Sequence, residues 1–214
     1  MAEPALKPEI PGGLERIPLP GLPEPGDCTA LRKQRERGRG TMWYVIQTFG
    51  GQEERTAGMI QKLVVPGCLE ECFVPRRERL KKFGGCWNKV EEVLFGGYVF
   101  VISDRPGQLY EELKRIPRLS RLLGREEDCF FPLGERDERL VRGIGGRKHH
   151  TPLSRIVLEE GKKIHVIEGP LKDYVGNVVK VNPHKREVVV QVEFMGRPVE
   201  LFMGVEMVRP GGGG

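Results

Sequence analysis

The stretch Val90–Ser103, with the sequence VEEVLFGGYVFVIS, places apolar residues in alternation on both sides of a glycine pair. A period of two is typical of a strand, and glycines inside a strand indicate a bend or a close backbone approach. We therefore predict one long strand over residues 90–102. The run RRERLKKF shortly before it is strongly basic. The aromatic rings around the glycines either fill a core or also form a docking surface.

The same pattern analysis extends over the first half of the chain. The expected elements are a strand at 43–49, a helix at 53–64, strands at 68–83 and 90–102, a helix at 107–116 and a final short strand within 118–133. A third helix is expected at 134–145. The order β-α-β-β-α-β predicts an α+β, ferredoxin-like domain over residues 42–145. Its helices would cover one face of an antiparallel sheet, and we expect the other face to stay uncovered.

The pattern changes after residues 146–160, which we predict to be a linker. Five short β-branched runs follow with no helical periodicity: KIHVI, VGNVVKV, EVVVQVEF, PVELFM and VEMV. Runs of this length and spacing predict a small five-stranded SH3-like β-barrel over residues 161–209. Because β-branched residues disfavour helix, we expect the barrel to be a constitutive β structure.

The two ends of the chain have no periodic pattern. Residues 1–41 are rich in Pro, Gly and Arg and are predicted to be a disordered extension, and the same is expected of residues 210–214. The basic end of the extension could contact RNA, but we favour a plain solvated tail. Met42 directly precedes the first expected strand, which makes it a candidate natural start.

Several classes of function find no support in the sequence. No apolar run approaches the length of a membrane span, and the first residues do not resemble a secretory signal, so we expect a cytoplasmic protein. The five cysteines lack the spacing of a zinc site and are expected to be reduced, without a metal. The pair His149–His150 receives no catalytic role. We expect neither an enzyme nor a cofactor.

Two motifs carry a resemblance to a known family. The segment HVIEGPLKDYVGNVVKVNPHKREVVVQV resembles the KOW motif, in which Gly176 would be a structural glycine that allows positive φ or close packing. The segments WYVIQTF and LFGGYVFV resemble the N-terminal (NGN) domain of the NusG family, whose usual form of the second is LFPGYVFV. Gly96 therefore replaces a proline. The run from Phe73 to Val101 looks most like LoaP, a specialised subfamily.

The resemblance implies a partner for the first domain. In this family the NGN sheet and its aromatic residues grip the clamp helices of bacterial RNA polymerase. The residues that the resemblance assigns to this contact are Trp43, Tyr44, Phe95 and Tyr98. The alternative is that these rings only fill the core, which we favour for Phe100.

Basic residues suggest a second contact of the first domain. Residues 74–90 hold six basic residues against one acid, and residues 114–125 hold five against none. Such fields attract phosphates without reading sequence, although a charged run is commonly a solvated face. The candidate nucleic-acid contacts are Arg76, Arg77, Arg79, Lys81, Lys82, Arg118 and Arg121, which the resemblance would place near non-template DNA.

The barrel is expected to bind a further partner. Its candidate contacts are Lys172, Tyr174, His184, Lys185, Arg186, Phe194, Met195 and Arg197. A LoaP-like barrel would bind a hairpin of nascent leader RNA. In NusG proteins the loop that matches FMGRPV contacts Rho or a ribosomal protein, and Met195 stands where an aromatic residue is common.

These inferences combine into one hypothesis and two alternatives. The hypothesis is a monomeric factor for transcription elongation, antitermination and regulation, which binds polymerase through the NGN domain and RNA through the KOW domain. One alternative is a housekeeping NusG that couples polymerase to Rho or the ribosome. The other is a ribosome-associated KOW protein that binds RNA and never contacts polymerase.

Overall fold

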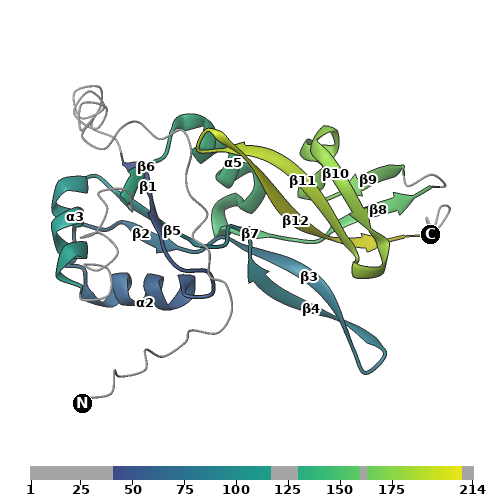
Figure 1. Ribbon diagram of the computed structural model, residues 1–214, viewed down its shortest axis with the longest axis horizontal. Helices are drawn as coiled ribbons and strands as arrows, with labels where there is room; N and C mark the ends of the chain where they lie inside the picture. The colour runs from purple at the N-terminus through teal and green to yellow at the C-terminus, as the bar shows by residue number, and fades with distance from the viewer. Residues whose placement is uncertain (1–40, 117–129, 160–162, 209–214) are drawn as a thin grey trace, which may run out of the picture.

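The computed structural model describes residues 41–116, 130–159 and 163–208, and it confirms a mixed α+β protein (Figure 1). The first sheet is four-stranded and antiparallel, with the order β2-β5-β1-β6. Its strands are β2 (Glu71–Phe73), β5 (Tyr98–Ser103), β1 (Met42–Gln47) and β6 (Phe130–Pro132). The predicted extension, the predicted tail and most of residues 118–133 lie outside the described residues.

Helices α2 (Glu53–Leu63) and α3 (Pro106–Arg115) cover one face of this sheet (Figure 1). Both begin and end within one residue of the predicted bounds. Acids occupy the first turn of α2, and proline opens α3, as helix starts favour. The helices bury Ile60, Leu109 and Leu113 against the sheet residues Val99 and Val101.

The long strands predicted at 68–83 and 90–102 are each broken in two. The first becomes β2 and β3 (Arg76–Phe83), because Pro75 interrupts it. The second becomes β4 (Cys86–Val93) and β5. Between these two strands Gly97 has φ 82°, and its amide donates to Glu53 Oε1 at 2.6 Å. Strands β3 and β4 form a hairpin that projects from the four-stranded sheet (Figure 1).

The predicted linker, residues 146–160, contains ordered structure instead. Helix α5 (Glu135–Gly145) leads into a short 3₁₀ helix, η2 (Gly146–Lys148), and then into β7 (His150–Thr151) and β8 (Ser154–Leu158). Strand β7 pairs in parallel with β3, and β8 joins the second sheet. The two-residue β7 is too short to give a pattern, whereas β8 has an apolar run as long as that of β9 and was wrongly assigned to the linker.

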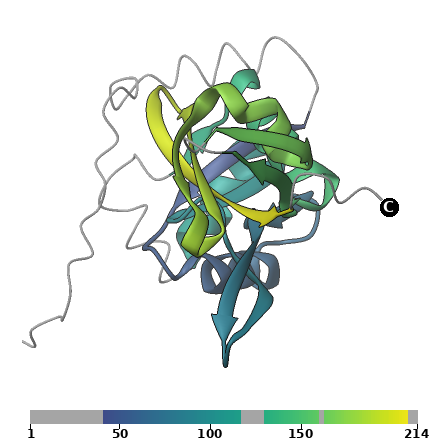
Figure 2. The same ribbon diagram turned by 90° about the vertical axis from the view of Figure 1, so that its right-hand side faces the viewer.

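The second sheet has five strands in the order β10-β11-β12-β8-β9. The remaining strands are β9 (Ile164–Glu168), β10 (Val178–Asn182), β11 (Glu187–Phe194) and β12 (Arg197–Met207), with short 3₁₀ helices η4 (Pro170–Asn177) and η5 (Pro183–Lys185) between them. The sheet is curled (Figure 2). The runs PVELFM and VEMV, expected to be two strands, form the single strand β12. The fifth strand of the sheet is β8, from the predicted linker.

The two sheets share one apolar core, so the prediction of an uncovered face was wrong. Helix α5 and the five-stranded sheet lie on the face of the first sheet that α2 and α3 leave open (Figure 1). Val141 and Ile144 of α5 belong to this core, together with Phe100 of β5 and Phe194 of β11. The expectation failed because the covering residues come from far along the chain.

Two other glycines, rather than Gly176, are constrained by their surroundings. A Cβ on Gly176 would meet nothing within 4 Å, and its φ is not positive, which contradicts the predicted role. A Cβ on Gly169, at φ 101°, would lie 2.6 Å from Ser154 Cα. A Cβ on Gly204 of β12 would lie 2.3 Å from the carbonyl oxygen of Glu78 in β3. The hairpin therefore packs directly on the backbone of β12.

We expect Gly204→Ala to lower the free energy of unfolding by about 1–3 kcal/mol, because the added methyl group forces β3 and β12 apart. Urea unfolding followed by circular dichroism measures the change. Gly176→Ala is the matched control and should change stability by less than about 0.5 kcal/mol. Equal effects of the two substitutions would contradict the close approach.

Candidate functional site

The four rings predicted to contact a polymerase helix are all buried, with exposed fractions of 2% for Trp43, 1% for Tyr44, 2% for Phe95 and 7% for Tyr98. Tyr44 lies on the helix-covered face, stacked on Phe130 at 4.9 Å between ring centroids. Burial raises the pKa of Tyr44 to about 12. The predicted set is therefore split between two faces of the sheet.

Trp43 lies on the opposite face from Tyr44, but it belongs to the core around α5. Its ring makes edge contacts with Phe73 at 5.1 Å and with His149 at 5.7 Å, and the Arg142 guanidinium lies 4.7 Å above it. Its indole Nε1 is buried without a hydrogen-bond partner in the part of the chain that the structure describes. Phe73 of β2, Arg142 of α5 and His149 after η2 thus cover Trp43.

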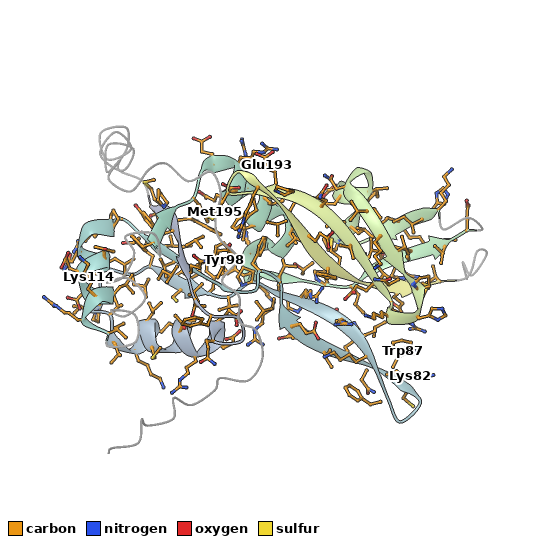
Figure 3. All side chains as sticks on the ribbon, in the orientation of Figure 1. Lys82, Trp87, Tyr98, Lys114, Glu193 and Met195 are labelled. Carbon is orange, nitrogen blue, oxygen red and sulfur yellow. The ribbon has the colours of Figure 1, made fainter. Side chains whose placement is uncertain are left out.

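Phe95 and Tyr98 are covered by the turn between β11 and β12, residues 194–197. The Phe194 ring lies 4.9 Å from the Phe95 ring and 5.9 Å from the Tyr98 ring, between centroids. Arg197 extends over the Tyr98 ring and donates a hydrogen bond to Tyr98 Oη. Desolvation lowers the pKa of Arg197. Tyr98 and Met195 are labelled in Figure 3, where both lie between the two sheets.

The same turn is also bound to α5 by polar contacts. The amide of Met195, at φ 52°, donates to Asp137 Oδ1 at 3.0 Å. Arg136 and Glu193 form an ion pair at 3.1 Å, with both side chains mostly exposed. Because exposed pairs contribute little, the apolar contacts around Phe194 dominate this closure.

The basic run on β3 is largely neutralised by acids from other elements. Arg76 pairs with Glu54 and Glu91, and Lys81 pairs with Glu92 at 2.7 Å. Lys82 is exposed, with no ion pair among the described residues. Arg118 and Arg121 lie outside the described residues. The count of charge along the sequence therefore overstated the free positive charge.

A partly buried ion network joins the hairpin to the second sheet. Arg77 contacts Glu92 at 2.9 Å and Glu187 at 3.8 Å, and Arg79 contacts Glu92 at 3.1 Å and Glu187 at 3.5 Å. The Arg77 guanidinium also donates to the carbonyl of Phe202. Desolvation lowers the pKa of Arg77. Burial acts to raise the pKa of Glu92, but hydrogen bonds from Lys81 and Arg79 lower it to about 2.

The predicted contacts of the second sheet fall into three groups. Lys172, His184 and Lys185 are exposed, and Tyr174 is half-buried. Phe194, Met195 and Arg197 form the turn that covers the first sheet. Arg186 places its guanidinium 4.3 Å from the centre of the Trp87 ring on the hairpin.

A pocket of about 870 Å³ between α2, β2 and β7 was missed by the sequence analysis. His149 stacks on Phe73 with centroids 3.4 Å apart, and its Nε2 lies 2.9 Å from Glu71 Oε1. His150 lies 3.3 Å from Glu91. The adjacent histidines were the available signal, but the acids that pair with them are distant in sequence.

Cys68, Cys72 and Cys86 are free thiols, and Cys28 and Cys129 lie outside the described residues. Burial raises the pKa of Cys72 to about 12. Within residues 41–116, 130–159 and 163–208, no group of three or more potential ligands is arranged around a metal position. No helix in these ranges is long and apolar enough to cross a membrane.

We expect Glu92→Gln to destabilise the protein in a pH-dependent way. Because the pKa of Glu92 falls from 4.5 to about 2 on folding, its ionised form stabilises the fold fully above about pH 4.5. That stabilisation is lost as the pH falls towards 2. The variant should lose about 1–2 kcal/mol of unfolding free energy at pH 7, since solvent partly screens these ion pairs, and the deficit should shrink by about half at pH 3. Urea unfolding at both pH values measures this.

The matched control is Glu168→Gln, which removes an exposed pair with Arg155. Its effect should be below about 1 kcal/mol at either pH. A deficit of Glu92→Gln that is the same at pH 7 and pH 3 would contradict the lowered pKa.

Comparison with known proteins gives a consistent result. A family model described as transcription termination factor nusG matches residues 41–142. The transcription termination/antitermination protein NusG of Haemophilus influenzae is 30% identical over 168 residues, which are 76% of this chain and 91% of that protein. The NusG of Thermus thermophilus is 28% identical over 173 residues, covering 74% and 94%. A solved structure described as "Domain interaction in Thermotoga maritima NusG" covers 78% of this chain and 96% of its own, with 23% identity and a TM-score of 0.49. The chain belongs to the NusG family.

Proposed function

We propose that this protein is a transcription elongation and antitermination factor that binds the clamp helices of bacterial RNA polymerase with the surface formed by Phe95, in the bend before β5, and Tyr98, the first residue of β5. In the arrangement described, the β11–β12 turn covers this face, so the turn must leave before a helix can bind. The observation that carries the proposal is the contact of Phe95 and Tyr98 with one ring, Phe194, from the second sheet.

The chemistry of this face suits a partner helix. Phe95 and Tyr98 lie beside the Gly96–Gly97 bend, and aromatic anchors in a shallow apolar groove are a common way to hold an amphipathic helix. Tyr98 also has a hydroxyl group that now accepts from Arg197 and would need a polar partner on the helix. Trp43 and Tyr44 are removed from the proposed contact, because α5 and Phe130, respectively, cover them.

The closed arrangement has an energetic consequence. A partner that binds only the open form has its affinity reduced by the fraction of molecules that are open. Opening exposes Phe95, Tyr98 and Phe194 to water, which costs about 1.5–3 kcal/mol for each fully buried apolar side chain. The β11–β12 turn would therefore lower the affinity of the chain for polymerase.

The finer assignments belong to the same proposal. We propose that residues 42–145 form a ferredoxin-like NGN domain and residues 161–209 a KOW domain of SH3-like type, to which β8 adds a strand from the predicted linker. The protein would act in the cytoplasm as a monomer and without catalysis. Its subfamily would be LoaP-like.

The second sheet would bind nascent RNA, since Lys172 and Lys185 are exposed on it. The second candidate is a housekeeping NusG in which the β11–β12 turn contacts Rho or a ribosomal protein. Phe194 of that turn packs on Phe95 and Tyr98, so opening would expose both contact surfaces together.

We expect Phe194→Ala to increase binding of a polymerase clamp-helix fragment by about tenfold or more, because it weakens the cover and raises the open fraction. Adding Tyr98→Ala to this variant should weaken binding again by about tenfold, since an anchor is lost. Isothermal titration calorimetry measures both changes. Leu63→Ala, at an exposed position on α2, is the control and should change nothing.

Circular dichroism establishes that each variant is folded. A folded Phe194→Ala variant that binds no more tightly than the unmodified chain would disprove the cover. Unchanged affinity on adding Tyr98→Ala would remove β5 from the polymerase contact.

A further inference from the structure

Two segments about 100 residues apart meet at the free end of the hairpin β3–β4. One is the hairpin tip, where Gly84 and Gly85, at φ 55° and 85°, join the strands. The other is the β10–β11 turn, residues 183–186. The Arg186 guanidinium lies 4.3 Å from the centre of the Trp87 ring, which fixes the contact. Trp87 and Lys82 are labelled together at this end of the molecule in Figure 3.

The hairpin register places a cation beside this stacked pair. Lys82 is paired across the strands with Trp87, so the two side chains are direct neighbours on one face of the ribbon. On the other face, Phe83 is 58% exposed at the very tip. An exposed ring and a stacked ring thus occupy the two faces of one projecting arm.

The basic side chains at this end of the hairpin have no acidic partners among the described residues, unlike those nearer its base. Arg76 and Lys81 are each held by acids, but Lys82 and Lys185 have no acidic partner among the described residues. His184 is also exposed beside Lys185. Positive charge without internal neutralisation is therefore concentrated around the Trp87–Arg186 pair.

The backbone also holds Arg186 in an uncommon conformation. Its φ of 49° and ψ of 52° lie in the left-handed region, which residues other than glycine and asparagine rarely adopt. Its amide donates to the carbonyl of Pro183 at 3.1 Å, which closes the turn. The turn thereby directs the guanidinium onto the indole ring.

We propose that this surface, formed by Lys82, Trp87, His184, Lys185 and Arg186 with Phe83 at its edge, binds unpaired RNA. Aromatic rings and guanidinium planes stack on bases without regard to sequence, and flanking lysines contact phosphates. The proposed partner is RNA, whose loops and ends offer unstacked bases, and single-stranded DNA is the alternative that the test compares.

The inference deepens the RNA-binding part of the proposed function and rests on it. It replaces the separate sites expected on the basic run and on the barrel with one site that the β3–β4 hairpin and the second sheet form together. Of the seven residues predicted on the first domain, it keeps only Lys82.

The test uses the full chain and a fluorescein-labelled 12-nucleotide U-rich RNA that cannot pair with itself, with binding measured by anisotropy between 50 and 200 mM salt. Trp87→Ala should weaken binding by about tenfold, because a stacking surface is lost. Lys82→Glu with Lys185→Glu should weaken binding and reduce the salt slope by about 1.4, as expected for two lost phosphate contacts.

Trp87→Phe separates stacking from a merely structural role. The chain has two tryptophans, and Trp43 is buried at 2% exposure, so a base stacked on Trp87 should quench the fluorescence of that residue. Trp87→Phe should retain binding within about threefold and lose the quenching. Binding without any quenching in the unmodified chain would overturn the stacking.

Control substitutions test whether the loss of binding is specific to this surface, and other nucleic acids test whether the ligand is unpaired RNA. Lys62→Glu with Lys163→Glu makes the same change of charge at exposed positions elsewhere and should leave the salt slope unchanged; an equal loss would overturn the site. Equal affinity for duplex RNA would also overturn it. Single-stranded DNA bound as tightly as RNA agrees with recognition by stacking and charge, whereas a preference for DNA overturns the assignment to RNA.

Failure of this site is distinguishable from failure of the proposed function. If the chain binds RNA but none of the substitutions at the hairpin tip affects it, this site is wrong and RNA binding elsewhere on the chain stands. If no RNA binds at 50 mM salt, both RNA claims fail. Binding of the clamp-helix fragment, measured in parallel on Phe194→Ala with and without Lys82→Glu and Lys185→Glu, tests the polymerase contact independently of both.

Discussion

The packing of Phe194 against Phe95, Tyr98 and Phe100 is the contact on which the rest of the structure depends. It makes one core out of two sheets that could each bury only one of their faces alone. The same contact brings Met195 to Asp137 and so ties α5 to the second sheet. A surface that is apolar enough to bind a partner helix is also apolar enough to bind a turn of its own chain. The closed arrangement follows from that chemistry.

A second contact, of different chemistry, fixes the other end of the interface. Arg77 and Arg79 share Glu92 and Glu187, and the side chain of Glu187 is only 4% exposed. Removing one member would leave charges buried without a partner, which costs more than the intact network contributes. The ionic end of the interface therefore depends on pH, whereas the apolar end around Phe194 does not.

Local patterns predicted the helices, and tertiary contacts decided the rest. Helices α2 and α3 matched within one residue because their acids, proline and apolar spacing are local signals. Trp43 and Tyr44 were placed on one surface, although successive residues of a strand face opposite sides. Arg77 and Arg79 looked like free charge because Glu187, which pairs with them, lies more than 100 residues away. The cover over Phe95 could not be predicted, since a sequence does not state which faces meet.

The two proposed sites are coupled through the geometry of the closed arrangement. Trp87 belongs to the hairpin and Arg186 to the second sheet, so the surface around them is complete only while the sheets stay together. A ligand shifts an equilibrium by its difference in affinity for the two states. RNA bound there would therefore favour the closed arrangement, whereas a helix bound at Phe95 and Tyr98 would require the open one. Because coupling between binding sites is reciprocal, polymerase binding should in turn weaken RNA binding by the same factor. Under both proposals, RNA binding at the hairpin tip and helix binding at Phe95 and Tyr98 would therefore oppose each other.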